Sequence, residues 1–352
     1  MYCNMMLTVA THMIETLTGQ TFEDFLHHRF FQPLGMTSTN LQPDAAIKAG
    51  LKDRMSTPYA WDQENNTFVP LDYEQSPEDQ GAGSIITSAN DYIKWVREIM
   101  NHEGKVIGQD LYNGITRPRI IENPDASDED LDPFHSWTAY AVGWETYFYR
   151  GHRIVNHDGL IGGFGTTHFF IPELKFGGVI FGNSGETSGS VASILMKELI
   201  DEALGIPREQ RVDWNALQAK RDAKDEDERE EEHKNLREEM CSSGDEPQPQ
   251  KVPLNAYTGE YFNLGYHSLA VTTKDQKLFV DATDRSMGYT LSFEHICDQT
   301  KYIAHLADWS DQTDTDELRA EFRFENDEVV KMGLHLEPEL DLIWFEKVAS
   351  AQ

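Results

Sequence analysis

The first 211 residues switch between the apolar spacing of helices and that of strands. Residues 6–17 carry apolar side chains three or four positions apart, which predicts a helix, and Gly19 suits its C-terminal end. Thr21 and Asp24 form a capping-box-like start for a second helix, which we expect to run to Phe31. The chain is therefore predicted to begin with two helices.

Further along, helices flank a group of strands. Ser88 is the expected N-cap of a helix whose apolar face includes Trp95 and Ile99, and residues 188–204 predict another helix. Between them the pattern predicts four strands, at residues 140–149, 153–157, 166–171 and 177–181. Because no helix separates these strands, we expect them to pair antiparallel. The block reads as an α+β domain with helices flanking an antiparallel sheet.

Residues 254–352 have a different pattern. Short apolar segments recur about every ten residues, which is typical of an all-β barrel or sandwich. The expected strands centre on Glu260, Ala270, Phe279, Leu291, Tyr302, Phe322, Val330 and Ile343. This block is therefore predicted to be a small β domain.

A highly charged segment separates the two blocks. Residues 220–246 contain 12 acidic and 6 basic residues, and a proline-rich stretch follows. This composition favours either a solvated helix or a disordered tether. We therefore predict three parts: residues 1–211, a linker over 212–253, and residues 254–352.

The charge of the chain limits its partners. Lys and Arg number 30 and Asp and Glu 61, for a net charge of −31. Phosphate neutralisation and attraction to an anionic membrane both need basic residues. We therefore expect neither nucleic acid nor a membrane as a partner, and no run of apolar residues is long enough to span a bilayer.

The cysteines indicate a reducing compartment. Cys3, Cys241 and Cys297 are odd in number and far apart, without a Cys-x-x-Cys pair. This pattern argues against a disulfide framework and against a structural zinc site. Residues 1–19 lack the basic start of a signal peptide. We expect a cytoplasmic protein without disulfides, metal ions or organic cofactors.

Two short motifs bring polar chemistry together. Tyr2 and Asn4 present a phenol and a carboxamide at the entrance of the first helix, although Asn4 is also an ordinary N-cap residue. His157 precedes Gly159 and Leu160 in a glycine-rich run that lets a ligand approach the backbone. The alternative for this run is a plain hairpin with an exposed histidine.

Two further segments have simpler alternatives. Ser184 lies between an apolar strand and a helix, as a nucleophile elbow requires, but Glu186 stands where that motif needs glycine. A turn that caps the following helix explains it better. Residues 81–84, Gly-Ala-Gly-Ser, either line a pocket or form a turn.

The order of these motifs is more specific than any one of them. Tyr-Cys-Asn at residues 2–4, Pro-Leu-Gly-Met at 33–36, the loop at 81–84 and His-Asp-Gly at 157–159 follow one another as in a known family. Residues 1 to about 205 resemble the serine β-lactamase and penicillin-binding-protein-like family, more narrowly its class C and esterase branch, the S12 peptidase group. The β block resembles the lipocalin-like domain appended to such proteins.

The resemblance implies roles for particular residues. Tyr2 would share proton transfer with a lysine, Asn4 would bind the acyl part of the substrate, and His157 would bind or polarise the substrate. Gly159 matches the third family motif, and the N–H of Leu160 would form half of an oxyanion hole. The family's Ser-x-x-Lys nucleophile motif is absent from this sequence.

Two hypotheses of function follow. In the first, the chain belongs to an acyl-serine hydrolase or acyltransferase that acts on a small-molecule or peptide amide or ester, with secondary metabolism as one setting. In the second, it is a truncated, non-catalytic paralogue that binds a ligand or a partner. The resemblance implies that the family's early strands are missing, so we expect a partner chain that completes the sheet.

Overall fold

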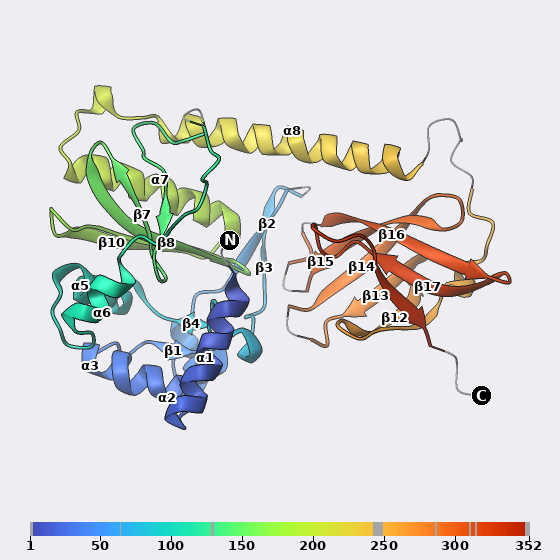
Figure 1. Ribbon diagram of the computed structural model, residues 1–352, viewed down its shortest axis with the longest axis horizontal. Coiled ribbons are helices and arrows are strands. Elements are labelled where there is room, and N and C mark those ends of the chain that lie inside the picture. The colour runs from blue at the N-terminus through green and yellow to red at the C-terminus, as the bar shows by residue number, and fades with distance from the viewer. Residues whose placement is uncertain are drawn as a thin grey trace. The chain divides into compact units, whose positions relative to one another are not determined.

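The chain forms two compact units in a computed structural model that describes residues 3–63, 65–127, 130–241, 249–285, 287–309, 311–313 and 315–348 (Figure 1). The first unit ends at Gln218 and the second begins at Ala219. This boundary lies inside the segment that the sequence predicts as a linker.

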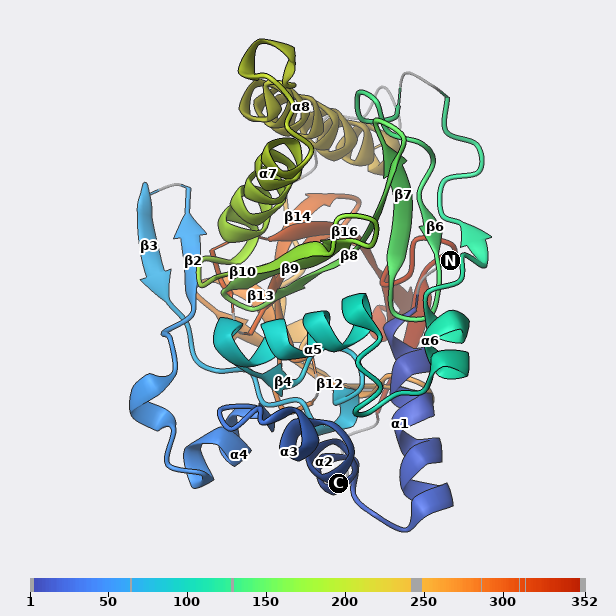
Figure 2. The ribbon, with the colours of Figure 1, turned by 90° about the vertical axis from the view of Figure 1, so that its left-hand side faces the viewer.

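A six-stranded antiparallel sheet is the centre of the first unit. Its order is β10 (Phe176–Gly182), β9 (Phe164–Ile171), β8 (His152–Ile161), β7 (Glu145–Tyr149), β6 (Ala139–Tyr140) and β5 (Ile120–Ile121). Helix α5 (Ala89–Asn101) covers one face and α7 (Gly185–Ala203) the other (Figure 2). The antiparallel pairing predicted from the sequence is confirmed.

Apolar side chains from both helices fill the layers. Ser88 caps α5 as predicted, because its Oγ accepts a hydrogen bond from the Asp91 N–H at 3.3 Å. Ile99 of α5 is fully buried in one cluster with the sheet, and Met196 of α7 is buried in the cluster on the opposite face. Alternate residues of each strand therefore supply the two cores.

The predicted N-terminal helices are present, with one difference. Helix α1 (Asn4–Thr18) ends at Gly19 in the left-handed conformation, and Thr21 Oγ1 caps α2 (Phe22–Leu26). The chain then continues through a π-helical turn, His27–Phe31, and a short α3, Gln32–Leu34. The helix therefore passes Phe31, where the prediction ended it.

Two strand predictions are also corrected. The segment 140–149 is two strands, because Gly143 adopts a left-handed φ of 75° and the Ala141 N–H donates to the Trp144 carbonyl at 2.7 Å. Strand β8 runs to Ile161, beyond the predicted end at residue 157. Most of the glycine-rich run is therefore strand, and its turn lies at residues 162–163.

Short elements complete this unit. Their bounds are β1 (Asn40–Leu41), α4 (Pro43–Lys48), β2 (Tyr59–Asp62), β3 (Thr67–Pro70), β4 (Ile85–Ile86) and α6 (Gln109–Ile115), with 3₁₀ turns at Lys52–Arg54, Pro77–Asp79 and Arg208–Gln210. Strand β1 pairs with β4, and β2 with β3.

The second unit contains a closed antiparallel barrel. Its strands are β11 (Gly259–Asn263), β12 (His267–Lys274), β13 (Lys277–Ala282), β14 (Tyr289–Cys297), β15 (Lys301–Asp308), β16 (Asp316–Glu325), β17 (Glu328–Leu334) and β18 (Ile343–Lys347), after a 3₁₀ turn at Leu254–Ala256. Every predicted strand centre lies in one of them. Tyr257, Tyr261, Tyr302 and Phe322 are almost completely buried in its core.

The charged segment forms a helix rather than a tether over the residues that the structure describes. Helix α8 runs from Trp214 to Met240. Near its C-terminal end, Arg237 binds Glu317 and reaches Glu294 at 3.2 Å, so this end packs on the barrel. No helix in the described ranges is long and apolar enough to cross a membrane.

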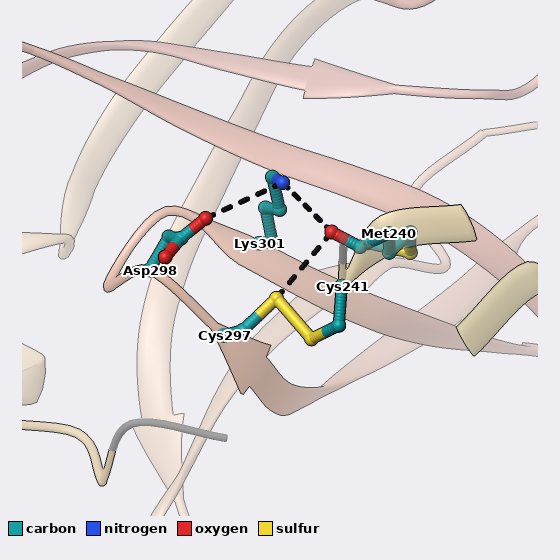
Figure 3. The surroundings of a disulfide bond; sticks show 5 residues. All are labelled: Met240, Cys241, Cys297, Asp298 and Lys301. Carbon is teal, nitrogen blue, oxygen red and sulfur yellow. Dashed lines mark hydrogen bonds and ion pairs between the residues drawn. A yellow bond between two sulfur atoms is a disulfide. The ribbon is translucent and has the colours of Figure 1, made fainter. Parts of the chain in front are cut away.

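A disulfide joins Cys241 to Cys297, 56 positions along the chain. Figure 3 shows Lys301 beside it, where the Nζ donates to the Met240 carbonyl at 2.7 Å and pairs with Asp298 at 3.3 Å. The prediction of reduced thiols is wrong for this pair, because the helix end and the end of β14 bring together cysteines that are distant in sequence. The cysteine pattern thus no longer supports a reducing compartment.

Reducing this disulfide is expected to destabilise the barrel. Opening a loop of 56 positions raises the conformational entropy of the unfolded chain. The free energy of unfolding therefore falls by about 2–4 kcal/mol. Denaturant unfolding with and without a reductant measures it, in a Cys3→Ser background that removes the free thiol. Identical stability under both conditions would contradict the bond's role.

Candidate functional site

One edge of β8 has no strand partner over its second half, among the residues that the structure describes. Strand β7 pairs with β8 only from His152 to Asn156, whereas β9 pairs with the opposite edge as far as Ile161. The unpaired edge begins at His157 and includes Gly159. Its backbone N–H and C=O groups are therefore placed to bind an extended chain.

A tyrosine hydroxyl contacts the imidazole of His157. His157 Nδ1 lies 2.7 Å from the Asp158 carbonyl oxygen, which can only accept, so Nδ1 carries the proton. In the neutral ring Nε2 is then an acceptor, and the Tyr140 O–H donates to it at 3.2 Å. The two side chains form a pair suited to proton transfer.

Sequence reasoning missed Tyr140. The residue lies inside the segment predicted as one strand, and nothing in its neighbours separates it from Tyr147 or Tyr149. Only the turn at Gly143, which creates β6, brings its hydroxyl to His157. A glycine inside a predicted strand was the available signal, because it often marks a break.

His168 lies directly opposite His157 on β9. Their rings are nearly parallel, with centroids 6.4 Å apart and an interplanar angle of 13°. Tyr92 and Trp144 pack around His168, and this burial lowers its pKa to about 3. His168 is therefore neutral at ordinary pH and does not oppose a positive charge on His157.

Carboxyl groups gather next to this pair. Burial, together with the charges of Glu122 and Asp158, raises the pKa of Glu145 to about 7. Asn156 Nδ2 donates to Glu145 Oε2 at 3.1 Å. Burial also raises the pKa of Glu122. The site therefore holds a carboxyl group that exchanges its proton near neutral pH.

Replacing Glu145 with glutamine is expected to remove a pH dependence of stability. The unfolded chain loses this proton near pH 4.5 and the folded chain near pH 7. The folded state therefore becomes less stable between these values, and the advantage of Glu145→Gln over the wild type in free energy of unfolding should grow by about 3 kcal/mol.

Denaturant unfolding at pH 4.5 and above pH 7 measures this difference. Glu209→Gln is the matched control, because that side chain is exposed. An advantage of Glu145→Gln that stays constant with pH would show that the carboxyl group is not perturbed.

The loop at residues 81–84 lies close to both α1 and the end of β8. A Cβ on Gly81 would lie 2.6 Å from the Leu7 carbonyl oxygen, so only glycine allows this approach to α1. A Cβ on Gly83 would lie 3.5 Å from Ile161 Cδ1. The loop thus lies against α1 and against the end of β8, two elements that are distant from each other in the sequence.

The other predicted site residues are placed as follows. Tyr2 lies outside the described residues, and Asn4 is the exposed first residue of α1, where Cys3 takes the N-cap position. The Asn4 carboxamide makes no hydrogen bond within the described part of the chain. On β8, Gly159 faces Thr166, and Leu160 pairs with Gly165 while 59% of it is exposed.

Ser184 occupies the start of α7. It is the N-cap residue but makes no side-chain capping bond. The free N–H groups here bond to Ser188 instead. Its Oγ accepts hydrogen bonds from the Gly165 N–H at 3.0 Å and from the Ser184 N–H at 3.3 Å. Within the described ranges no group of three metal-ligating side chains could hold an ion.

Comparison with known proteins identifies the family. A family model described as β-lactamase matches residues 1–200. The chain belongs to the β-lactamase family. A second model, described only as a domain of unknown function (DUF3471), matches residues 244–347 of this β-lactamase-family chain.

Two curated relatives match most of the chain. The unguisins hydrolase of Aspergillus campestris is 30% identical over 354 residues, which cover 98% of this chain and 63% of the relative. The unguisins hydrolase of Aspergillus violaceofuscus is 33% identical over 323 residues, covering 84% of this chain and 54% of the relative. The chain therefore spans less than two thirds of the length of these relatives.

A solved structure shows the same fold. The octameric penicillin-binding protein homologue from Pyrococcus abyssi superposes with a TM-score of 0.52 at 17% identity. The match covers 98% of this chain and 65% of that one. At this identity the likeness concerns the fold alone.

Proposed function

We propose that this β-lactamase-family chain is the substrate-positioning part of an acyl-serine hydrolase that cleaves an amide bond in a peptide-like substrate. The observation that carries the proposal is the Tyr140–His157 pair beside the unpaired edge of β8. Two relatives named unguisins hydrolases support a hydrolytic activity. An unguisin is accordingly the substrate we would test first.

The proposed mechanism uses the unpaired edge of β8. An extended substrate would bind there through main-chain hydrogen bonds, which places its carbonyl near His157. The imidazole would orient the substrate and pass a proton with help from the Tyr140 hydroxyl. The N–H of Leu160 would contribute to an oxyanion hole, with Tyr2 and Asn4 in the family roles of proton transfer and acyl binding.

We further propose that the nucleophile comes from polypeptide outside these 352 residues. Ser-x-x-Lys is absent from the sequence, and the relatives extend well beyond the matched part. Strand β10 pairs only with β9 within the described residues, so its outer edge is open to a further strand. The apolar row Val191, Leu195 and Leu199 on α7 is about half exposed, as expected of a docking surface.

We also propose a finer classification of the two units. The order of the sequence motifs supports the class C and esterase branch of the family, the S12 peptidase group. A closed barrel of eight antiparallel strands in sequence order supports a lipocalin-like second unit. Transfer of the acyl group to an acceptor other than water would use the same residues.

A non-catalytic binding role is the second candidate. Helix α1 exposes an apolar row, which together with the open β10 edge favours a protein that associates with a partner. The row consists of Met6, Val9, Met13 and Leu17. In this alternative the His157 site would bind a ligand without turnover.

Reconstitution separates the two candidates. The 352-residue chain is mixed or co-expressed with that part of the Aspergillus campestris relative which has no counterpart in this chain. Unguisin cleavage is then followed by mass spectrometry. The proposal predicts a complex that cleaves, while neither component does so alone. A complex that binds an unguisin without cleaving it would favour the second candidate.

A further inference from the structure

The sequence contains a single acceptor motif for N-linked glycosylation. Asn65, Asn66 and Thr67 form the pattern Asn-x-Thr with a residue other than proline in the middle, and no other asparagine of the chain has serine or threonine two positions later. Such a short motif also arises by chance. Its meaning therefore depends on where the fold places it and on the compartment in which the chain folds.

The fold places this motif at the tip of a hairpin (Figure 2). Strand β2 pairs with β3 as far as Asp62 and Thr67, so the turn lies between these two residues. Asn65, Asn66 and Thr67 are all exposed. Asn66 adopts a left-handed φ of 52°, which asparagine tolerates in a turn. A glycan on Asn65 would therefore extend into solvent without displacing a packed side chain.

The hydrogen bonds of the turn are compatible with a modified Asn65. Its Nδ2 donates to Asp62 Oδ2 at 2.8 Å, and its backbone N–H donates to Asp62 Oδ1 at 2.9 Å. The amide nitrogen carries two hydrogens, and glycosylation replaces only one of them. The bond to Asp62 can therefore persist in the glycosylated protein.

The disulfide of the second unit is an independent observation that points to the same compartment. Cys241 and Cys297 are bonded to each other. Disulfides form and persist in oxidising environments such as the lumen of the endoplasmic reticulum. The same lumen is where eukaryotic cells attach N-linked glycans, and the two curated relatives come from the eukaryotic genus Aspergillus. A chain that acquires this disulfide there also meets the glycosylation machinery.

The hairpin exposes groups that a glycan at its tip would shield. Strands β2 and β3 pair only with each other among the described residues, so each has an edge that no strand covers. Trp61 and Phe68 lie opposite each other on these strands and are 39% and 48% exposed. Open edges with exposed aromatic side chains favour association between chains. A bulky hydrophilic group beside them would hinder that association.

We propose that Asn65 carries an N-linked oligosaccharide, which a transferase adds from a lipid diphosphate donor. Asn65 Nδ2 attacks the anomeric carbon of the first sugar. The bond from that carbon to the diphosphate oxygen breaks, its electron pair leaves with the lipid diphosphate, and one amide proton passes to a base of the transferase. The targeting signal that this route requires would lie outside these 352 residues. The proposal does not depend on the hydrolytic activity.

Peptide mapping of the native protein, purified from its source organism, tests the proposal. Treatment with peptide N-glycosidase in ¹⁸O-labelled water converts a glycosylated asparagine to an aspartate that carries the heavy oxygen. We expect this label at Asn65 in the tryptic peptide of residues 55–94, and none at Asn66 or Asn90, which lie in the same peptide without an acceptor motif. An unmodified Asn65 in the native protein would overturn the proposal, whatever the outcome of the cleavage assay.

Two variants at Thr67 show whether the motif itself is used. Thr67→Ala destroys the motif and leaves Asn65 in place, whereas Thr67→Ser keeps the motif. Because Thr67 is exposed, the fold should tolerate both changes. Expressed in the source organism, the alanine variant should lose the glycan and migrate like the glycosidase-treated wild type, and the serine variant should retain it. A glycan that persists in Thr67→Ala, or that is lost equally in both variants, would contradict the proposal.

Discussion

Replacing Phe322 with alanine is expected to lower the free energy of unfolding of the barrel by about 3–5 kcal/mol. The ring is fully buried, and it contacts the rings of Tyr257 at 5.1 Å and Tyr302 at 5.3 Å between centroids. Close-packed aromatic neighbours cannot close the space that the missing ring leaves. The substitution therefore costs both the burial of the ring and the cavity that remains.

Hydrogen exchange of the barrel strands measures this change without assuming that the two units unfold together. Phe262→Ala is the matched control, because the same side chain on β11 is 40% exposed. We expect faster exchange throughout β12–β17 in the Phe322 variant and almost no change of the exchange rates in the control. Equal effects of the two substitutions would show that the barrel core is not organised around Phe322.

Replacing His157 with alanine is expected to lower kcat/KM of the reconstituted hydrolase by about 10²–10⁴-fold, the usual contribution of a positioned general acid or base. Tyr140→Phe should cost about tenfold, because it removes one hydrogen bond to Nε2 and leaves the imidazole in place. The smaller loss would identify Tyr140 as a residue that acts through His157.

His152→Ala is the control for this series. It removes an imidazole from the other end of β8, where the ring binds the exposed Glu173, and it should leave kcat/KM unchanged. Comparable losses for the two histidine variants would indicate damage to β8 rather than lost chemistry. Full activity of His157→Ala would remove this residue from the mechanism.

The elements with strong local signals could be predicted from the sequence. Ser88 and Thr21 cap the helices that follow them, because a short hydroxyl side chain satisfies a free N–H wherever a helix begins. The eight barrel strands lie at their predicted centres, since alternation and turn residues recur at a regular distance. Such features depend on only a few neighbouring residues.

Features that depend on distant contacts could not be predicted. Cys241 and Cys297 are brought together by the end of α8 and the end of β14, and neither segment indicates the other. The Tyr140 hydroxyl reaches His157 only because Gly143 turns the chain between two strands. His157 itself was found from its motif, whereas its tyrosine partner has no motif. Prediction therefore located one half of the pair.

Covalent labelling tests the central claim most directly. The 352-residue chain, alone and together with the unmatched part of the Aspergillus campestris relative, is treated with a serine-directed fluorophosphonate, and each polypeptide is weighed by intact-mass spectrometry. The account predicts that the added polypeptide carries the label and that this chain carries none in either sample. A label on this chain, at Ser184 or another serine, would show that it holds its own nucleophile and would contradict the account.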